Sequence, residues 1–107
     1  MRRLAIALAA LAVCGLAQAA NPEAGKKKAA QVCAACHGPE GKTPAAPENP
    51  ILAGQYYDYL VRALSDYKSG KRANPIMKGF AASLSKQDIE DLAAWFSGQS
   101  SGLHSQR

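Results

Sequence analysis

Cysteine and histidine are scarce in this chain. The 107 residues include three cysteines and two histidines, and Cys14 falls in an apolar run near the amino terminus. A disulfide framework is excluded, because the remaining Cys33 and Cys36 lie too close together to cross-link distant parts of a fold. A zinc site needs two further clustered ligands beside these thiols, and His104 is the only histidine left after His37. A zinc site is therefore disfavoured.

Strong charge of one sign and a membrane-spanning run are also missing. The formal net charge is +5, and it becomes +5 − 2 = +3 if the arginine pair at positions 2–3 is removed with a leader. This small positive net charge is not typical of a nucleic-acid-binding protein. The apolar run over residues 4–16 is shorter than the roughly 20 residues that cross a bilayer. We expect neither nucleic-acid binding nor stable membrane insertion.

The amino-terminal segment is typical of a secretory signal peptide. A basic pair at positions 2–3 precedes the apolar run, and residues 17–19 offer an A-x-A cleavage site. The pattern predicts a cleaved signal over 1–19, a periplasmic location and a single domain over 20–107. Cys14 then leaves with the signal. The alternative, a lipid-modified Cys14, would tether the protein to a membrane.

The motif Cys33-Ala34-Ala35-Cys36-His37 is what covalent haem attachment requires. Each thiol can add to one vinyl group, and the adjacent imidazole then reaches the iron as an axial ligand. A redox dithiol would also use two cysteines at this spacing, but it is expected among alternating strands and helices. No strand pattern is apparent here. The motif therefore predicts one covalently bound haem c per chain, with iron bound by His37.

Three helices joined by two irregular stretches are predicted, which makes the chain all-α. The first begins with Asn21 as N-cap and runs to about Cys33, and the third begins after Ser85, with Asp88 completing a capping box. The prolines of residues 38–54 forbid a regular helix and predict a loop wrapped over something. Apolar residues at three- and four-residue spacing predict the second helix, over about 55–69: Tyr56, Tyr59, Leu60, Ala63, Leu64 and Tyr67.

Iron bound by His37 needs a sixth ligand or an open position. Beyond the signal, Met77 is the only methionine, and it falls in the second predicted irregular stretch, residues 71–84. A methionine there is better explained as an iron ligand than as core filler. His104 competes, but it lies in a polar tail expected to be exposed. Lys78 could replace Met77 only at high pH, because an ammonium is a poor ligand near neutrality.

With these residues in place, the chain resembles a class I c-type cytochrome. Within that class it is most similar to small bacterial proteins that resemble one half of the di-haem periplasmic cytochromes. The resemblance covers residues 23–99 and includes the family's Pro-x-Leu-x-Gly element at residues 50–54. It implies a cytochrome c fold, in which long loops wrap around one haem. It also implies that the Pro50 carbonyl accepts a hydrogen bond from His37 and that Met77 is the sixth ligand.

The resemblance further implies a crossing of the first and last helices, where Gly25 and Ala29 meet Trp95. The chain departs from the family at Ala29, because that position often holds an aromatic residue. The smaller alanine leaves space that Trp95 is expected to fill.

His/Met ligation saturates the iron, raises its reduction potential and leaves one-electron transfer as the available chemistry. We therefore expect a soluble periplasmic electron carrier, not an enzyme, that docks transiently on redox partner proteins. The alternatives are a haem subunit of a larger redox complex, and a haem enzyme or gas-binding protein with a labile sixth ligand. Lys71, Arg72 and Lys78 form a candidate basic rim for acidic partners, or simply solubilising charge. Arg72 has a further alternative, which is pairing with a haem propionate.

Overall fold

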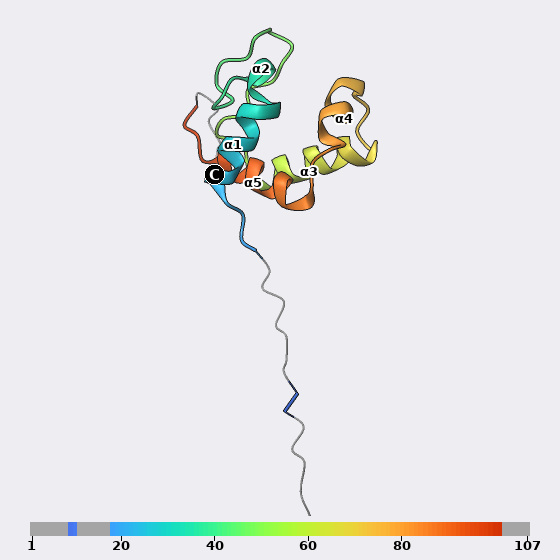
Figure 1. Ribbon diagram of the computed structural model, residues 1–107. Helices are drawn as coiled ribbons and strands as arrows, with labels where there is room; N and C mark the ends of the chain where they lie inside the picture. Colours follow the sequence, from blue (N-terminus) through green and yellow to red (C-terminus); the bar gives the residue numbers. More distant parts are fainter. Residues whose placement is uncertain (1–8, 11–17, 102–107) are drawn as a thin grey trace, which may run out of the picture.

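The computed structural model describes residues 9–10 and 18–101, and every regular element in these ranges is helical (Figure 1). The prediction of an all-α fold is confirmed. Helices α1 and α5 pack against each other, and α3 packs against both α5 and α4. The five helices are α1 (Pro22–Val32), α2 (Ala34–His37), α3 (Tyr57–Ser69), α4 (Pro75–Ala81) and α5 (Lys86–Ser97).

Helix α4 corrects the prediction that residues 71–84 are irregular. The Asn74 side chain accepts hydrogen bonds from the backbone N–H groups of Ile76 and Met77, and Pro75 occupies the first helical position. The Asn-Pro pair is thus a helix start and not a loop signal, because proline's missing N–H costs nothing there. The second predicted helix is confirmed with a later start, at Tyr57. It ends as expected at Gly70, which is left-handed with φ of 83°.

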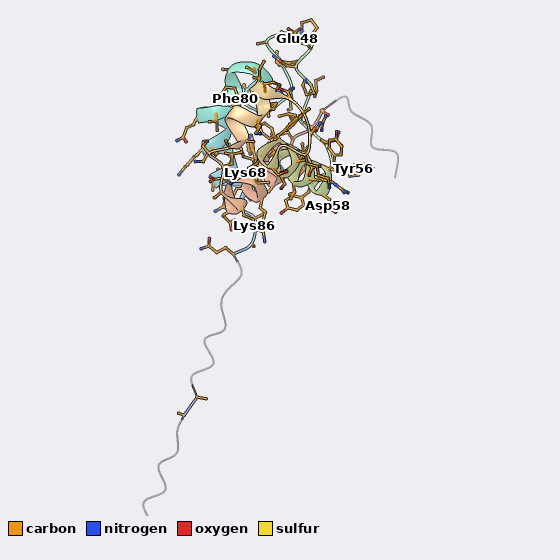
Figure 2. The ribbon with its side chains drawn as sticks, turned by 90° about the vertical axis from the view of Figure 1, so that its right-hand side faces the viewer. Glu48, Tyr56, Asp58, Lys68, Phe80 and Lys86 are labelled. Atoms are coloured by element: carbon orange, nitrogen blue, oxygen red, sulfur yellow. The ribbon has the colours of Figure 1, made fainter. Side chains whose placement is uncertain are left out.

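The proline-rich connection between α2 and α3 is irregular as predicted. Glu48 lies at its outer tip, on the side of the helical body opposite Lys86 (Figure 2). The returning end of this connection is fixed to the body of the fold. The N–H of Leu52 donates to the Gly41 carbonyl at 2.9 Å, and the N–H of Gly54 donates to the Phe96 carbonyl of α5, also at 2.9 Å.

The crossing of α1 and α5 confirms the contact that the family resemblance implied. Gly25 is buried, and a Cβ atom built on it would lie 2.0 Å from the Asp91 carbonyl oxygen. Only glycine permits so close an approach of the two backbones. Ala29 is 0% exposed, and Trp95 packs against the core cluster that contains it. The Trp95 indole N–H also donates to the Pro39 carbonyl at 3.0 Å. The crossing therefore anchors the start of the proline-rich connection.

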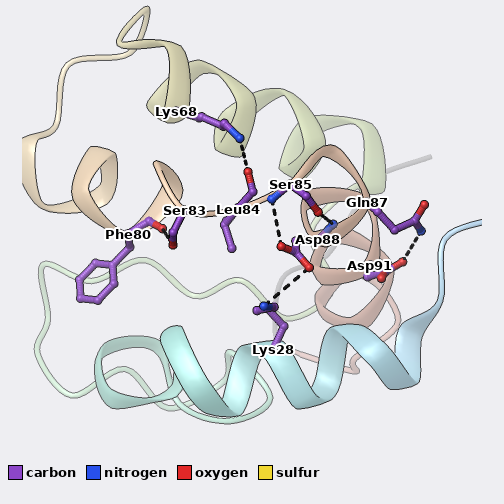
Figure 3. Close-up of polar contacts among 9 residues, drawn as sticks. All are labelled: Lys28, Lys68, Phe80, Ser83, Leu84, Ser85, Gln87, Asp88 and Asp91. Atoms are coloured by element: carbon purple, nitrogen blue, oxygen red, sulfur yellow. Dashed lines mark hydrogen bonds and ion pairs between the residues drawn. The ribbon is translucent and has the colours of Figure 1, made fainter.

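The predicted capping box at the start of α5 is present (Figure 3). The Ser85 hydroxyl accepts from the Asp88 N–H at 3.0 Å, and the Asp88 carboxylate accepts from the Ser85 N–H at 2.9 Å. Lys28 of α1 lies 3.8 Å from the same carboxylate. The pKa of Asp88 is lowered, chiefly by the bond from the Ser85 backbone and less by Lys28. Because the folded-state pKa is depressed, this stabilisation is present above the unfolded pKa and is lost as pH falls through the folded pKa.

Replacing Asp88 with Asn is expected to lower the free energy of unfolding by about 1 kcal/mol at pH 7, a typical value for a helix cap. The cost should shrink below about pH 4, where the unfolded carboxyl is itself protonated. Urea denaturation at several pH values measures both effects. Glu90→Gln removes the same charge from the same helix without touching the cap and serves as control. A pH-independent cost for Asp88→Asn would contradict this account.

Within residues 9–10 and 18–101, no helix combines the length and the apolar character needed to cross a bilayer. Most of the predicted signal over 1–19, including Cys14, lies outside the described residues, as does His104.

Candidate functional site

Cys33, Cys36 and His37 are brought together by one turn of helix. Cys33 separates α1 from α2, and its carbonyl accepts from the N–H of Cys36 at 3.2 Å and of His37 at 3.0 Å. Residues three and four apart on a helix share a face. The left-handed Gly38, with φ of 81°, then turns the chain away. All three side chains consequently line one cavity.

The His37 imidazole is buried and held in one orientation. It is 6% exposed, and its Nδ1 lies 2.9 Å from the Pro50 carbonyl oxygen. A carbonyl can only accept, so Nδ1 must carry the proton. The lone pair of the neutral ring is then on Nε2, the nitrogen that remains free to bind a metal. The hydrogen bond implied by the resemblance is thus present.

Asn49 makes a hydrogen bond to the haem motif that was not predicted from the sequence. Its side-chain N–H₂ donates to the Cys36 carbonyl at 3.1 Å, and the same carbonyl accepts from the Ala45 N–H at 2.9 Å. Asn49 and Pro50 are adjacent, so one dipeptide of the proline-rich connection holds both Cys36 and His37. The place of Asn49 directly before Pro50 in the sequence was the one hint of this role. The partner of the Asn49 side chain is a backbone carbonyl, and a backbone group cannot be identified from the pattern of residue types.

The cavity has a volume of about 380 Å³ and is lined mainly by apolar side chains. Its walls come from every helix, and the buried core residues Leu60, Leu92 and Phe96 form part of them. This size and character are typical of a small-molecule or cofactor site. The buried core therefore forms part of the wall of this cavity.

Met77 lies in the same cavity as His37 but on a different element. The half-buried Met77 is on α4, and its N–H donates to the Asn74 side chain at 3.0 Å. In Figure 1, α2 and α4 stand on separate sides of the fold, above α3 and α5. One cavity thus presents an imidazole nitrogen from α2 and a thioether from α4, two donors that bind haem iron in cytochromes.

The two thiols also fit covalent attachment. Both are free, and both border the cavity. Burial raises the pKa of Cys33 to about 11, so this thiol keeps its proton at neutral pH and resists oxidation. Across the described residues, no group of three or more His, Cys, Asp or Glu side chains could hold a metal ion. The two thiols beside His37 suit covalent attachment of a haem.

Comparisons with known proteins assign the chain to one family. The sequence model of the cytochrome c family matches residues 22–100. Cytochrome c4 of Pseudomonas aeruginosa is 44% identical over 100 residues, which are 92% of this chain and 49% of that protein. The thiosulfate dehydrogenase electron acceptor of Stutzerimonas stutzeri is 40% identical over 92 residues, which are 81% of this chain and 43% of that protein.

Among solved structures, reduced recombinant cytochrome c4 from Pseudomonas stutzeri superposes with a TM-score of 0.72 at 42% identity. The match covers 79% of this chain and 48% of that one. The chain spans about half the length of these relatives.

Proposed function

Because this chain belongs to the cytochrome c family and accordingly carries covalent haem c, we propose that it is a one-electron carrier with His37 and Met77 as axial iron ligands. Cys33 and Cys36 form the two thioether bonds. When bound, the haem supplies reversible one-electron chemistry at its iron. The pairing of His and Met favours the reduced state relative to harder ligand pairs.

The observation that carries this proposal is the fixed tautomer of His37 in a cavity it shares with Met77. With Nδ1 committed to Pro50, the ring can present only Nε2 to the iron. Local hydrogen bonds hold the segment that carries each ligand. His37 is buried and bonded to the chain behind it, and Met77 sits in the first turn of a capped helix. Ligands held in this way favour electron transfer with little structural change.

We infer the cellular location from the amino-terminal sequence and the partners from one of the relatives. The signal-like sequence over 1–19 favours export and a periplasmic location, with residues 20–107 as the haem domain. A relative named as an electron acceptor of thiosulfate dehydrogenase favours a dehydrogenase as one transient partner. A role as a haem subunit of a larger redox complex is the second candidate.

Replacing Met77 with Ala is expected to open the iron and to lower its reduction potential by on the order of 0.1–0.3 V, part of the roughly 0.8 V over which axial ligands act. The oxidised protein should lose the weak long-wavelength band that reports iron–thioether coordination, and the reduced protein should bind CO. Spectroscopic redox titration measures the potential, and a CO difference spectrum measures ligand access.

His104→Ala is the matched control, since it removes the competing ligand and should change neither property. If the unmodified protein already lacks the thioether band and binds CO readily, the carrier proposal fails in favour of a gas-binding protein or haem enzyme.

A further inference from the structure

Asp91 is a buried carboxylate that the proposed electron transfer does not use. It lies on α5, is 7% exposed, and its backbone carbonyl is the one that approaches Gly25 of α1. The ion pairs found among residues 9–10 and 18–101 involve other carboxylates, and no lysine or arginine nitrogen there lies within 4.0 Å of the Asp91 side chain. A buried carboxylate without a cation is costly, because it loses the solvation of its charge. A positive group beside Asp91 would therefore stabilise the fold.

The donors that Asp91 does have connect it to the segment that leads into α1. The backbone N–H of Asn21 donates to Asp91 Oδ1 at 2.7 Å. The Gln87 side-chain N–H₂ donates to the same oxygen at 2.8 Å and to the Ala19 carbonyl at 3.3 Å. Figure 3 shows the contact of Gln87 with Asp91 beside the chain that enters α1. The segment over 19–21 is thus held against one carboxylate of α5.

This segment contains the predicted cleavage site of the leader, after Ala19. Hydrolysis of the Ala19–Ala20 bond by a leader peptidase consumes one water and leaves a carboxylate on Ala19 and an α-ammonium on Ala20, which is largely protonated at neutral pH. Three bonds separate the Ala20 and Asn21 nitrogens, about 4 Å at most, so the ammonium begins within roughly 7 Å of Asp91 Oδ1. Rotation within Ala20 alone can close that gap once the peptide bond is cut.

We propose that the α-ammonium group released by leader cleavage binds the Asp91 carboxylate, so that processing itself strengthens the crossing of α1 and α5. The cation that the chain gains on processing appears beside the one carboxylate that is buried among the described residues. Cleavage also removes the Ala19 carbonyl, which leaves the Gln87 amide committed to Asp91. The inference rests on the export and cleavage in the proposed function but not on Met77 as ligand.

The ammonium is subject to two opposing effects. It lies at the start of α1, where the helix dipole is positive and repels a cation. Asp91 attracts it, and this attraction is stronger than in water because the carboxylate is buried. The proposal requires the attraction to exceed the repulsion, which gives the effect of processing on stability a definite sign.

The test compares two haem-loaded proteins that differ only in where they begin. One is the natural mature chain from Ala20. The other begins at Gln18, because its leader is exchanged for one that is cleaved two residues earlier, and its Ala20 nitrogen is an uncharged amide. The longer form should have a thermal unfolding midpoint lower by on the order of 4–8 °C. A longer form at least as stable as the natural one would overturn the proposal.

Asp91→Asn, made in both forms, identifies the cause of the difference. It removes the charge of the carboxylate, so the difference between the two forms should fall to less than about half. Glu90→Gln is the matched control, since it removes a carboxylate at the neighbouring position and should leave the difference intact. A difference that survives Asp91→Asn undiminished would contradict the proposed pair.

A chemical variant keeps the test decisive if Asp91→Asn captures too little haem. Transamination of the mature protein with pyridoxal phosphate converts the Ala20 ammonium into an uncharged carbonyl without lengthening the chain. It should lower the midpoint about as much as the extension does, and an unchanged midpoint would overturn the proposal.

Intact mass tests the cleavage separately. A mature chain that begins at a residue other than Ala20 would overturn this inference and leave the assignment of His37 and Met77 standing. A missing thioether band in the unmodified protein would do the reverse, so the two failures are distinguishable.

Discussion

Replacing both Cys33 and Cys36 with Ser is expected to yield a chain without covalent haem and without a stable fold. The predicted mature chain has 107 − 19 = 88 residues, and domains this small bury a limited core. Four of the nine buried apolar residues in the described part of the chain are alanines, and a haem in the cavity would add a large apolar surface to this core. The free energy of unfolding should fall from the 5–15 kcal/mol typical of native domains to near zero.

Intact mass and circular dichroism measure these effects on protein expressed with its leader in a bacterium that attaches haem c. The unmodified protein should have the mass of residues 20–107 plus one haem. Ala35→Ser is the matched control, because it places a hydroxyl inside the motif at an exposed position and leaves both thiols. A double variant that retained full helicity and a cooperative melt without haem would show that the polypeptide supplies its own core.

Replacing Gly25 with Ala should destabilise the protein by about 3 kcal/mol, at the upper end of the usual cost of overpacking. The added Cβ would lie 2.0 Å from the Asp91 oxygen and 2.5 Å from the Asp91 carbonyl carbon. Both are backbone atoms, so no side-chain rotation relieves the clash and α1 must move away from α5. This cost exceeds the roughly 1 kcal/mol by which Ala favours a helix over Gly.

Gly79→Ala is the control for this prediction. Gly79 is also inside a helix, but a Cβ built on it meets nothing within 4 Å. It should leave stability unchanged or raise it by up to about 1 kcal/mol. Thermal and urea denaturation of both variants give the comparison. Equal stability of Gly25→Ala and the unmodified protein would mean that α1 and α5 tolerate a wider separation than the structure has.

The ends of helices show which features of this fold could be predicted from the sequence. The Ser85–Asp88 capping box and the termination at Gly70 were predicted, because each depends on residues within a few positions of one another. The prediction of an irregular stretch over residues 71–84 was wrong because the local sequence there is ambiguous. Asn-Pro signals both a turn and a helix start, and only the path of the following chain decides between them.

The haem motif is local too. Cys33, Cys36 and His37 fall on one helical face through their spacing alone, and so the cofactor could be inferred from the sequence by itself. Pro50 was identified only through resemblance, since nothing in its local sequence points to an imidazole 13 residues away.

Tertiary structure alone decided what surrounds that motif. It placed Met77 of α4 in the cavity of His37, set Asn49 on the Cys36 carbonyl, and brought Arg72 beside two tyrosines of α3. Some of these contacts join segments that are distant along the chain. Others involve backbone atoms, which are the same in every residue type and so leave no pattern in the sequence. Spacing along a helix encodes which side chains share a face, but packing between helices determines what that face meets.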